Sequence, residues 1–214
     1  MKSFVIAIKD LPESIQAAKK CIRSGNRHGI DIEYFDAITP KNTDVYARMH
    51  ELGLPLYFKE IYSRKDNCIA AFLSHYSLWE QCKESGEEYQ IFEHDAVIVN
   101  DIPETLNYLG CISLGKPSYG KFVTPSTIGV NTLTSKEYFP GAHAYRITPK
   151  GASLLVTESK NSACPTDLFL DIRRFPFLQE YYPWPVEVRE SFTTIQSERG
   201  CYAKHGYNNE YKII

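Results

Sequence analysis

The sequence predicts an α/β domain in which helices cover a central, mostly parallel sheet in a Rossmann-like arrangement. Two observations support this prediction. Residues 3–8 form a continuous apolar run, as in a central parallel strand that is buried on both faces. A helical segment and a second strand follow directly, which is the order that opens a layered α/β fold. The length of 214 residues suits one domain, so we expect a single domain over residues 1–214.

The first helix is expected to begin at Asp10, whose side chain can cap the first turn, with Pro12 inside that turn. Apolar residues at helical spacing continue to a stop near Gly25. Residues 30–35 then alternate between apolar and polar types, which predicts the second strand.

The next segments differ sharply in how regular they are. Residues 40–64 have no strong period, and we expect a loop with one short helix that forms a flap over the strand ends. Residues 67–84 form the clearest helix, because one apolar face recurs at steps of three and four residues. This face consists of Ile69, Phe72, Leu73, Tyr76 and Trp79. Residues 89–92 are a short apolar strand that leads into residues 93–95, and an apolar run resumes over residues 96–99.

The second half of the sequence is mixed. A strand is expected near residues 111–114, followed by loops over the Gly-, Ser- and Thr-rich residues 116–134. Residues 143–147 are strand-like, and Thr148 then caps a helix that runs to about Ser159. The remaining predicted elements are a short helix that opens at residues 165–167 and a strand at residues 186–188.

Composition excludes several classes of protein. The chain has 24 Lys and Arg against 26 Asp and Glu, and a net charge of -2 gives no electrostatic basis for nucleic-acid binding. The six cysteines are scattered without a CxxC pair, which argues against a disulfide scaffold or a structural zinc site. The apolar run at the N-terminus is too short for a signal peptide or a membrane span. We therefore expect a cytoplasmic protein with free thiols.

The acidic triplet Glu93-His94-Asp95 is the most informative motif. Two carboxylates at a strand end within an apolar segment are costly unless something pairs with them. Ligands of open α/β sheets lie at the carboxyl ends of strands, where a divalent cation could bridge these carboxylates to a diphosphate. Residues i and i+2 of an extended backbone point the same way, so Glu93 and Asp95 are expected to share one side and His94 the other. An exposed loop with two ordinary acids is the alternative.

Several blocks of sequence resemble one known family. Residues 67–79, with their Phe-Leu-Ser-His and a tryptophan four residues after the histidine, are followed by residues 91–97 around the acidic triplet. These blocks are similar to glycosyltransferase family 25, the lipooligosaccharide and collagen-type galactosyl- or glucosyltransferases. The further similar blocks are residues 141–152, residues 165–170 with their Pro-x-Asp, and a closing block of residues 182–195. Because the blocks keep their order, the resemblance spans residues 4 to about 197 and is specific.

The resemblance implies a GT-A type fold and a metal-dependent, inverting transfer of a sugar. The expected donor is a nucleotide-diphosphate sugar, with a UDP-hexose as the expected example, and the acceptor is a hydroxyl of a glycan or glycoprotein. The expected cofactor is Mn²⁺ or Mg²⁺. The resemblance also implies Asp167 as the catalytic base, and Glu93, Asp95 and Glu190 as metal ligands. The donor-binding residues that it implies are Ala7, Ala37, Ser74, His75 and Glu93. His143 and Tyr145 are the implied contacts of the acceptor or sugar.

Other interpretations of these residues stay open. Ser74 could bond within its helix, and His75 could be a satisfied core histidine. Both His143 and Tyr145 could serve strand packing, and Asp167 could be only a partner of a helix dipole.

His94 stands where the family usually has a second acid. A glycan- or nucleotide-binding module that has lost turnover is therefore the main alternative function, and a metal-dependent phosphoesterase is another.

Overall fold

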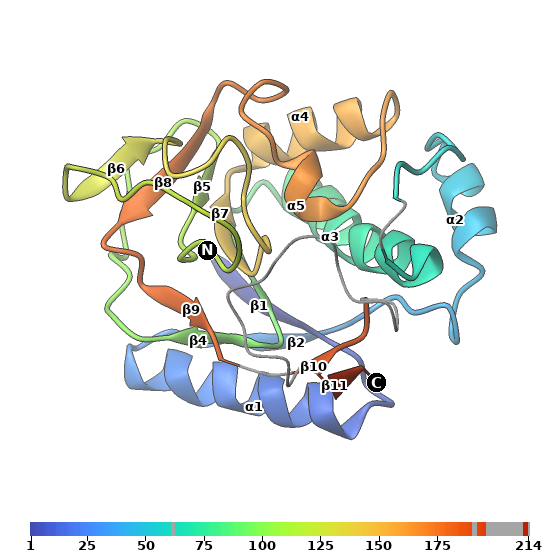
Figure 1. Cartoon of the computed structure of the whole chain (residues 1–214), viewed down its shortest axis with the longest axis horizontal. Helices are drawn as coiled ribbons and strands as arrows, with labels where there is room; N and C mark the ends of the chain where they lie inside the picture. The colour runs from blue at the N-terminus through green and yellow to red at the C-terminus, as the bar shows by residue number, and fades with distance from the viewer. Residues whose placement is uncertain (61–62, 190–191, 196–211, 214) are drawn as a thin grey trace.

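A seven-stranded sheet forms the centre of the protein (Figure 1). The computed structural model describes residues 1–60, 63–189, 192–195 and 212–213. Across the sheet the strands are β2 (Glu33–Asp36), β1 (Lys2–Ala7), β3 (Tyr89–Glu93), β7 (Ala144–Ile147), β5 (Cys111–Ser113), β8 (Leu178–Tyr182) and β6 (Gly129–Thr132).

Five of these seven strands run in the same direction. Strand β1 pairs in parallel with β2 and β3, and β5 pairs in parallel with β8. Strand β7 is antiparallel to both β3 and β5, and β6 is antiparallel to β8 at the edge. The predicted α/β, Rossmann-like architecture with a mostly parallel central sheet is confirmed.

Helices and a small second sheet cover the two faces of the central sheet (Figure 1). The helices are α1 (Pro12–Arg27), α2 (Val45–Glu51), α3 (Lys65–Ser85), α4 (Pro149–Ser159) and α5 (Thr166–Phe169). Helix α1 packs on one face together with the antiparallel pair β4 (Ala96–Ile98) and β9 (Val186–Val188). The other helices lie over the opposite face. A short parallel pair, β10 (Phe192–Thr193) and β11 (Lys212–Ile213), completes the described elements.

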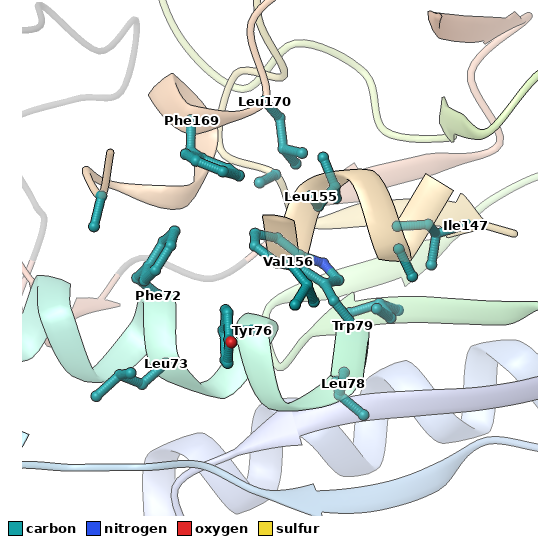
Figure 2. Close-up of a cluster of buried hydrophobic side chains, with 14 of the residues drawn as sticks. Phe72, Leu73, Tyr76, Leu78, Trp79, Ile147, Leu155, Val156, Phe169 and Leu170 are labelled. Atoms are coloured by element: carbon teal, nitrogen blue, oxygen red, sulfur yellow. The ribbon is translucent and has the colours of Figure 1, made fainter. Parts of the chain in front are cut away.

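The larger core lies between α3, α4, α5 and the sheet (Figure 2). The face of α3 predicted from its period is buried there, and Trp79 has no exposed surface. Phe169 of α5 packs against the Phe72 ring at 5.3 Å and stacks on Trp79 at 5.5 Å. These aromatic contacts fix the short helix α5 on α3. No described helix has the length and apolar character needed to cross a membrane.

Three predicted boundaries differ from those in the structure: the start and the end of α1 and the start of β2. Leu11, not Asp10, is the N-cap of α1, and the Leu11 side chain makes no capping hydrogen bond. The helix begins at Pro12, whose fixed φ suits the first helical position. The helix also passes Gly25 and ends at Arg27. Gly25 allows a close approach, since a Cβ there would lie 3.0 Å from the backbone oxygen of Ile30 and 2.5 Å from the Ile32 side chain. The apolar residues before β2 therefore pack under α1, and the strand itself begins at residue 33.

The sequence interpretation missed strands β6, β8, β10 and β11. Within β8, Glu180 interrupts the apolar pattern although it is buried. Its Oε1 accepts bonds from the backbone N–H groups of Thr134 and Ser135, each at 2.7 Å, which compensates for burying the carboxylate. Strand β6 is polar because it lies at the edge of the sheet. By contrast, the predicted Thr148 cap is confirmed, as its hydroxyl accepts from the N–H of Gly151 at 3.0 Å.

We expect Gly151→Ala to destabilise the protein strongly. A Cβ at this position would lie 2.2 Å from the backbone oxygen of Gly110, so α4 and the start of β5 would have to separate. Overpacking of this kind costs about 3 kcal/mol at its upper end, more than the roughly 1 kcal/mol that alanine adds in helix propensity. Urea unfolding measures the loss. Ser153→Ala on the same helix serves as the control and should change stability by less than about 0.5 kcal/mol.

Candidate active site

Three strands deliver predicted donor-binding residues to the same edge of the sheet. Ala7 ends β1, Ala37 follows β2, and Glu93 ends β3. The N–H of Ala37 donates to the carbonyl of Ala7 at 2.9 Å, and Ile6 is paired with Glu93 across β1 and β3. This is the carboxyl edge of parallel strands, where open α/β sheets bind their ligands. Direct contact of these residues with a donor stays a prediction.

A chain of hydrogen bonds connects the core to Glu93. Trp79 Nε1 donates to the Tyr145 hydroxyl at 2.8 Å, and His75 Nδ1 lies 2.8 Å from the same hydroxyl. His75 Nε2 lies 3.2 Å from Glu93 Oε1. Trp79, His75 and Tyr145 are buried, whereas the Glu93 side chain is 29% exposed. Helix α3 and strand β7 thus hold one carboxylate at the mouth of the site.

The hydrogen bonds determine how His75 is protonated when Glu93 is ionised. A carboxylate only accepts, so Nε2 must carry the hydrogen that points to Glu93. Nδ1 then accepts from the Tyr145 hydroxyl, which itself accepts from Trp79. Burial lowers the pKa of His75 to about 3, so the ring is neutral at physiological pH. His75 therefore orients the carboxylate as a neutral donor.

Ser74 lies one residue before His75 and is fully buried. Its hydroxyl accepts from the N–H of Ile38 at 2.9 Å and donates to the carbonyl of Ala70 at 2.9 Å. It thereby attaches α3 to the segment that follows β2. Contact between this side chain and the donor stays a prediction, and its two bonds give it a structural part in the site.

The acidic triplet has a different backbone from the one expected. Strand β3 ends at Glu93, and residues 94–95 form a turn before β4, so the argument from an extended backbone is wrong for Asp95. His94 faces α1, where its Nδ1 lies 3.1 Å from Ser14 Oγ, and its ring stacks on Phe192 at 5.2 Å. Since Glu93 faces α3, the prediction that His94 points away from Glu93 agrees with these contacts.

Asp95 leaves part of its carboxylate without a partner. Its Oδ1 is buried and accepts no hydrogen bond in the described structure. Burial and the nearby charge of Asp95 together raise the pKa of Glu93 well above its ordinary value. The third predicted metal ligand, Glu190, lies outside the described residues. In the part of the chain that the structure describes, no three His, Cys, Asp or Glu side chains are grouped as a metal site requires.

Asp167 approaches this site from α5. The packing of Phe169 fixes the helix. The charge of Asp167 adds to the raised pKa of Glu93 and partly opposes the lowered pKa of His75, so Asp167 lies close to both residues. The Tyr119 hydroxyl donates to Asp167 Oδ2, and the N–H of Leu168 donates to Oδ1 at 2.9 Å. Burial raises the pKa of Asp167, and the hydrogen bond from Tyr119 opposes that shift.

No sequence pattern indicates Tyr119, because it lies in the irregular segment that precedes β6.

His143 and Tyr145 are buried beside the site rather than exposed to an acceptor. His143 is 2% exposed and Tyr145 has no exposed surface. The His143 ring fills the space above two glycines: a Cβ on Gly115 would lie 2.4 Å from Nε2, and one on Gly141 would lie 3.2 Å from Nδ1. Burial lowers the pKa of His143, and the negative charge of Asp95 partly opposes this shift. Their contact with the acceptor stays a prediction and would require a change of conformation.

Removing the Tyr145 hydroxyl should destabilise the protein. In Tyr145→Phe the Trp79 N–H and the His75 ring lose their shared partner inside the core, and each unpaired buried group costs about 1–3 kcal/mol. We expect a total loss of about 2–6 kcal/mol in urea unfolding. Tyr76→Phe is the matched control, since its hydroxyl bonds only the half-buried Glu80 in the described structure; its cost should be about 1 kcal/mol.

Comparison with known proteins identifies the family. The sequence profile of glycosyltransferase family 25 (LPS biosynthesis protein) matches residues 1–170, which include the acidic triplet and the Pro-x-Asp block but not the closing block of residues 182–195. A comparison with curated proteins gives no match. Among solved structures, a chain of CTP:phosphocholine cytidylyltransferase from Streptococcus pneumoniae (LicC) is 13% identical, with 86% of this chain and 91% of that chain covered and a TM-score of 0.36. The profile match shows that this chain, with its mixed α/β fold, belongs to glycosyltransferase family 25 and is a glycosyltransferase.

Proposed function

We propose that the protein is a metal-dependent, inverting glycosyltransferase that moves a hexose from a nucleotide-diphosphate sugar, a UDP-hexose, to a hydroxyl of a glycan or glycoprotein. The observation that carries the proposal is the pair of carboxylates at the carboxyl edge of the sheet. Glu93 and Asp95 lie close enough for one charge to raise the pKa of the other. Such repulsion is costly in a half-buried site unless a positive charge joins the pair.

The chemistry of these residues fits a hard divalent cation. Both are carboxylates, the oxygen ligands that Mg²⁺ and Mn²⁺ prefer, and Asp95 Oδ1 is a buried acceptor without a hydrogen bond in the described structure. Glu93 and Asp95 would hold the ion, with Glu190 as the predicted third ligand. A bound cation would supply positive charge against the diphosphate of the leaving group.

Asp167 is the residue that we propose as the general base. It lies near Glu93, and burial raises its pKa toward the range in which a carboxylate accepts a proton efficiently. Its carboxylate would take the proton of the acceptor hydroxyl as that oxygen forms a bond to the anomeric carbon. The bond from the anomeric carbon to the nucleoside diphosphate breaks on the opposite side, which inverts the configuration.

Two measurements test the proposed function. A thermal-shift screen of nucleotide sugars, each with and without Mn²⁺, should show stabilisation by one donor class that depends on the metal. With that donor, transfer to glycan acceptors should produce the free nucleoside diphosphate and a product of inverted anomeric configuration. Donor binding without release of the diphosphate would favour the binding module instead, in which His94 replaces the family's second acid. Retained configuration would contradict the inverting mechanism.

A further inference from the structure

A hollow of about 710 Å³ lies beside α1, and its described lining is almost entirely basic. The residues around it are Lys20, Arg23, Arg27, Val97 and Arg189. Four of these five side chains are cationic in a protein whose net charge is -2. A concentration of one charge in a concave surface focuses the field and attracts the opposite charge. We call this surface the basic hollow.

Helix α1 supplies most of this charge from one exposed face. Lys20, Arg23 and Arg27 follow one another at steps of three and four residues, so their side chains lie on the same stripe of the helix. All three are exposed, while the opposite face of α1 is buried on the sheet. The only acidic residue of the helix is Glu13, in its first turn. Helix α1 itself therefore places no carboxylate on this stripe.

Arg189, which directly follows β9, lines the hollow together with α1's stripe of cations. Its N–H donates to the carbonyl of Asp95 at 3.2 Å, and its guanidinium bonds Glu187 at 3.3 Å. In the described structure, neither Arg23 nor Arg27 forms an ion pair with a carboxylate. Like charges in proximity repel one another, so this arrangement favours an anion that enters the hollow.

The residue types indicate which anion fits. Three of the four cations are arginines, whose planar fork donates two parallel bonds to a phosphate. A membrane surface is a poorer match, since stable binding to it also needs apolar side chains that insert. No large hydrophobic side chain of α1 is among the exposed ones of the described chain. We propose that the basic hollow is a binding site for a phosphate group of a discrete phosphorylated ligand.

The part of this site that Arg23 and Arg27 line lies away from the donor-binding edge. Ser14, which contacts His94 of the acidic triplet, precedes Arg27 by 13 residues of α1, or about 20 Å at 1.5 Å per residue. The hollow therefore extends from the neighbourhood of Asp95 toward the far end of the helix. A phosphate bound there would be a second anionic group, additional to the diphosphate of the proposed donor.

Isothermal titration with inorganic pyrophosphate, in metal-free buffer with EDTA, tests the site. The variant Arg23→Gln/Arg27→Gln should bind pyrophosphate at least about 10-fold more weakly than the parent protein. The variant Lys150→Gln/Lys160→Gln removes the same charge from exposed positions at α4 and should bind like the parent. Arg189→Gln removes a cation of the hollow that does not belong to α1, and this variant should also bind pyrophosphate more weakly. Thermal unfolding of each variant shows whether the fold is retained.

Three results would overturn the proposal. Equal weakening in both double variants would mean a general effect of net charge, and unchanged affinity in Arg23→Gln/Arg27→Gln would mean that pyrophosphate binds elsewhere. Binding to vesicles of anionic lipid that depends on Arg23 and Arg27, without binding of pyrophosphate, would assign the hollow to a membrane surface. Donor binding in the thermal-shift assay should survive in Arg23→Gln/Arg27→Gln, so the failure of this site and the failure of the proposed glycosyl transfer are distinguishable.

Discussion

Replacing Asp95 with asparagine will reduce metal-dependent sugar transfer by at least about 100-fold, because the change removes a charged oxygen ligand from the proposed cation site while it keeps the shape of the side chain. The stability of the metal-free protein should stay the same or increase. Asp95 Oδ1 is a buried acceptor without a bond in the described structure, and its charge raises the pKa of Glu93. The substitution removes the charge at this buried acceptor, and it also removes the repulsion between Asp95 and Glu93.

A loss of sugar transfer without a loss of stability would identify Asp95 as a functional carboxylate and not a structural one. Transfer with saturating Mn²⁺ and urea unfolding with EDTA would be measured on the same preparation. Asp101→Asn is the matched control, since Asp101 is exposed and pairs with His28 at 2.7 Å, away from the triplet. Transfer by Asp95→Asn at the parental rate would show that the metal assignment is wrong. A large loss of stability would assign Asp95 to the fold.

The sequence predicted those parts of the fold whose side chains follow one simple pattern. Helix α3 is an example, because its apolar face repeats at helical steps and is buried along its length. Strands β1 and β3 contain the apolar runs 4–7 and 91–92 because they lie inside the sheet. Strand β8 was not predicted, since the bonds that make Glu180 acceptable in the interior come from residues 134–135, far away in the sequence.

The candidate site shows the same division. The acidic triplet was found from its place at the end of an apolar strand, and the structure places it at the carboxyl edge of the sheet. The turn at residues 94–95 was not foreseen, because spacing alone does not distinguish a turn from an extended backbone. The contacts that organise the site come from separate elements: Tyr145 bonds His75, and Tyr119 bonds Asp167. Contacts of this kind depend on tertiary structure, and a local sequence pattern does not predict them.

Asp167→Asn should leave donor binding unchanged and reduce transfer by at least about 100-fold, the lower end expected for a general base. The substitution is nearly isosteric, and an amide oxygen can still accept the bond from Tyr119. Donor affinity by calorimetry and the transfer rate would be compared with those of Asp171→Asn, a control in which the carboxylate bonds Arg173 instead. Loss of both donor affinity and transfer would assign Asp167 to the donor site or the fold. Loss of neither would leave Glu190 or another carboxylate as the base.

The pH dependence of transfer provides an independent test of the same assignment. A general base must be ionised, so the rate should fall as the pH decreases through the pKa of Asp167, which burial raises above its ordinary value. The hydrogen bond from Tyr119 favours the ionised form and therefore lowers this pKa. Tyr119→Phe removes that bond, the pKa of Asp167 rises further, and the acidic limb of the pH–rate profile should move to higher pH. An acidic limb that stays in place in Tyr119→Phe would mean that a group other than Asp167 accepts the proton, because the hydroxyl of Tyr119 donates to that carboxylate directly.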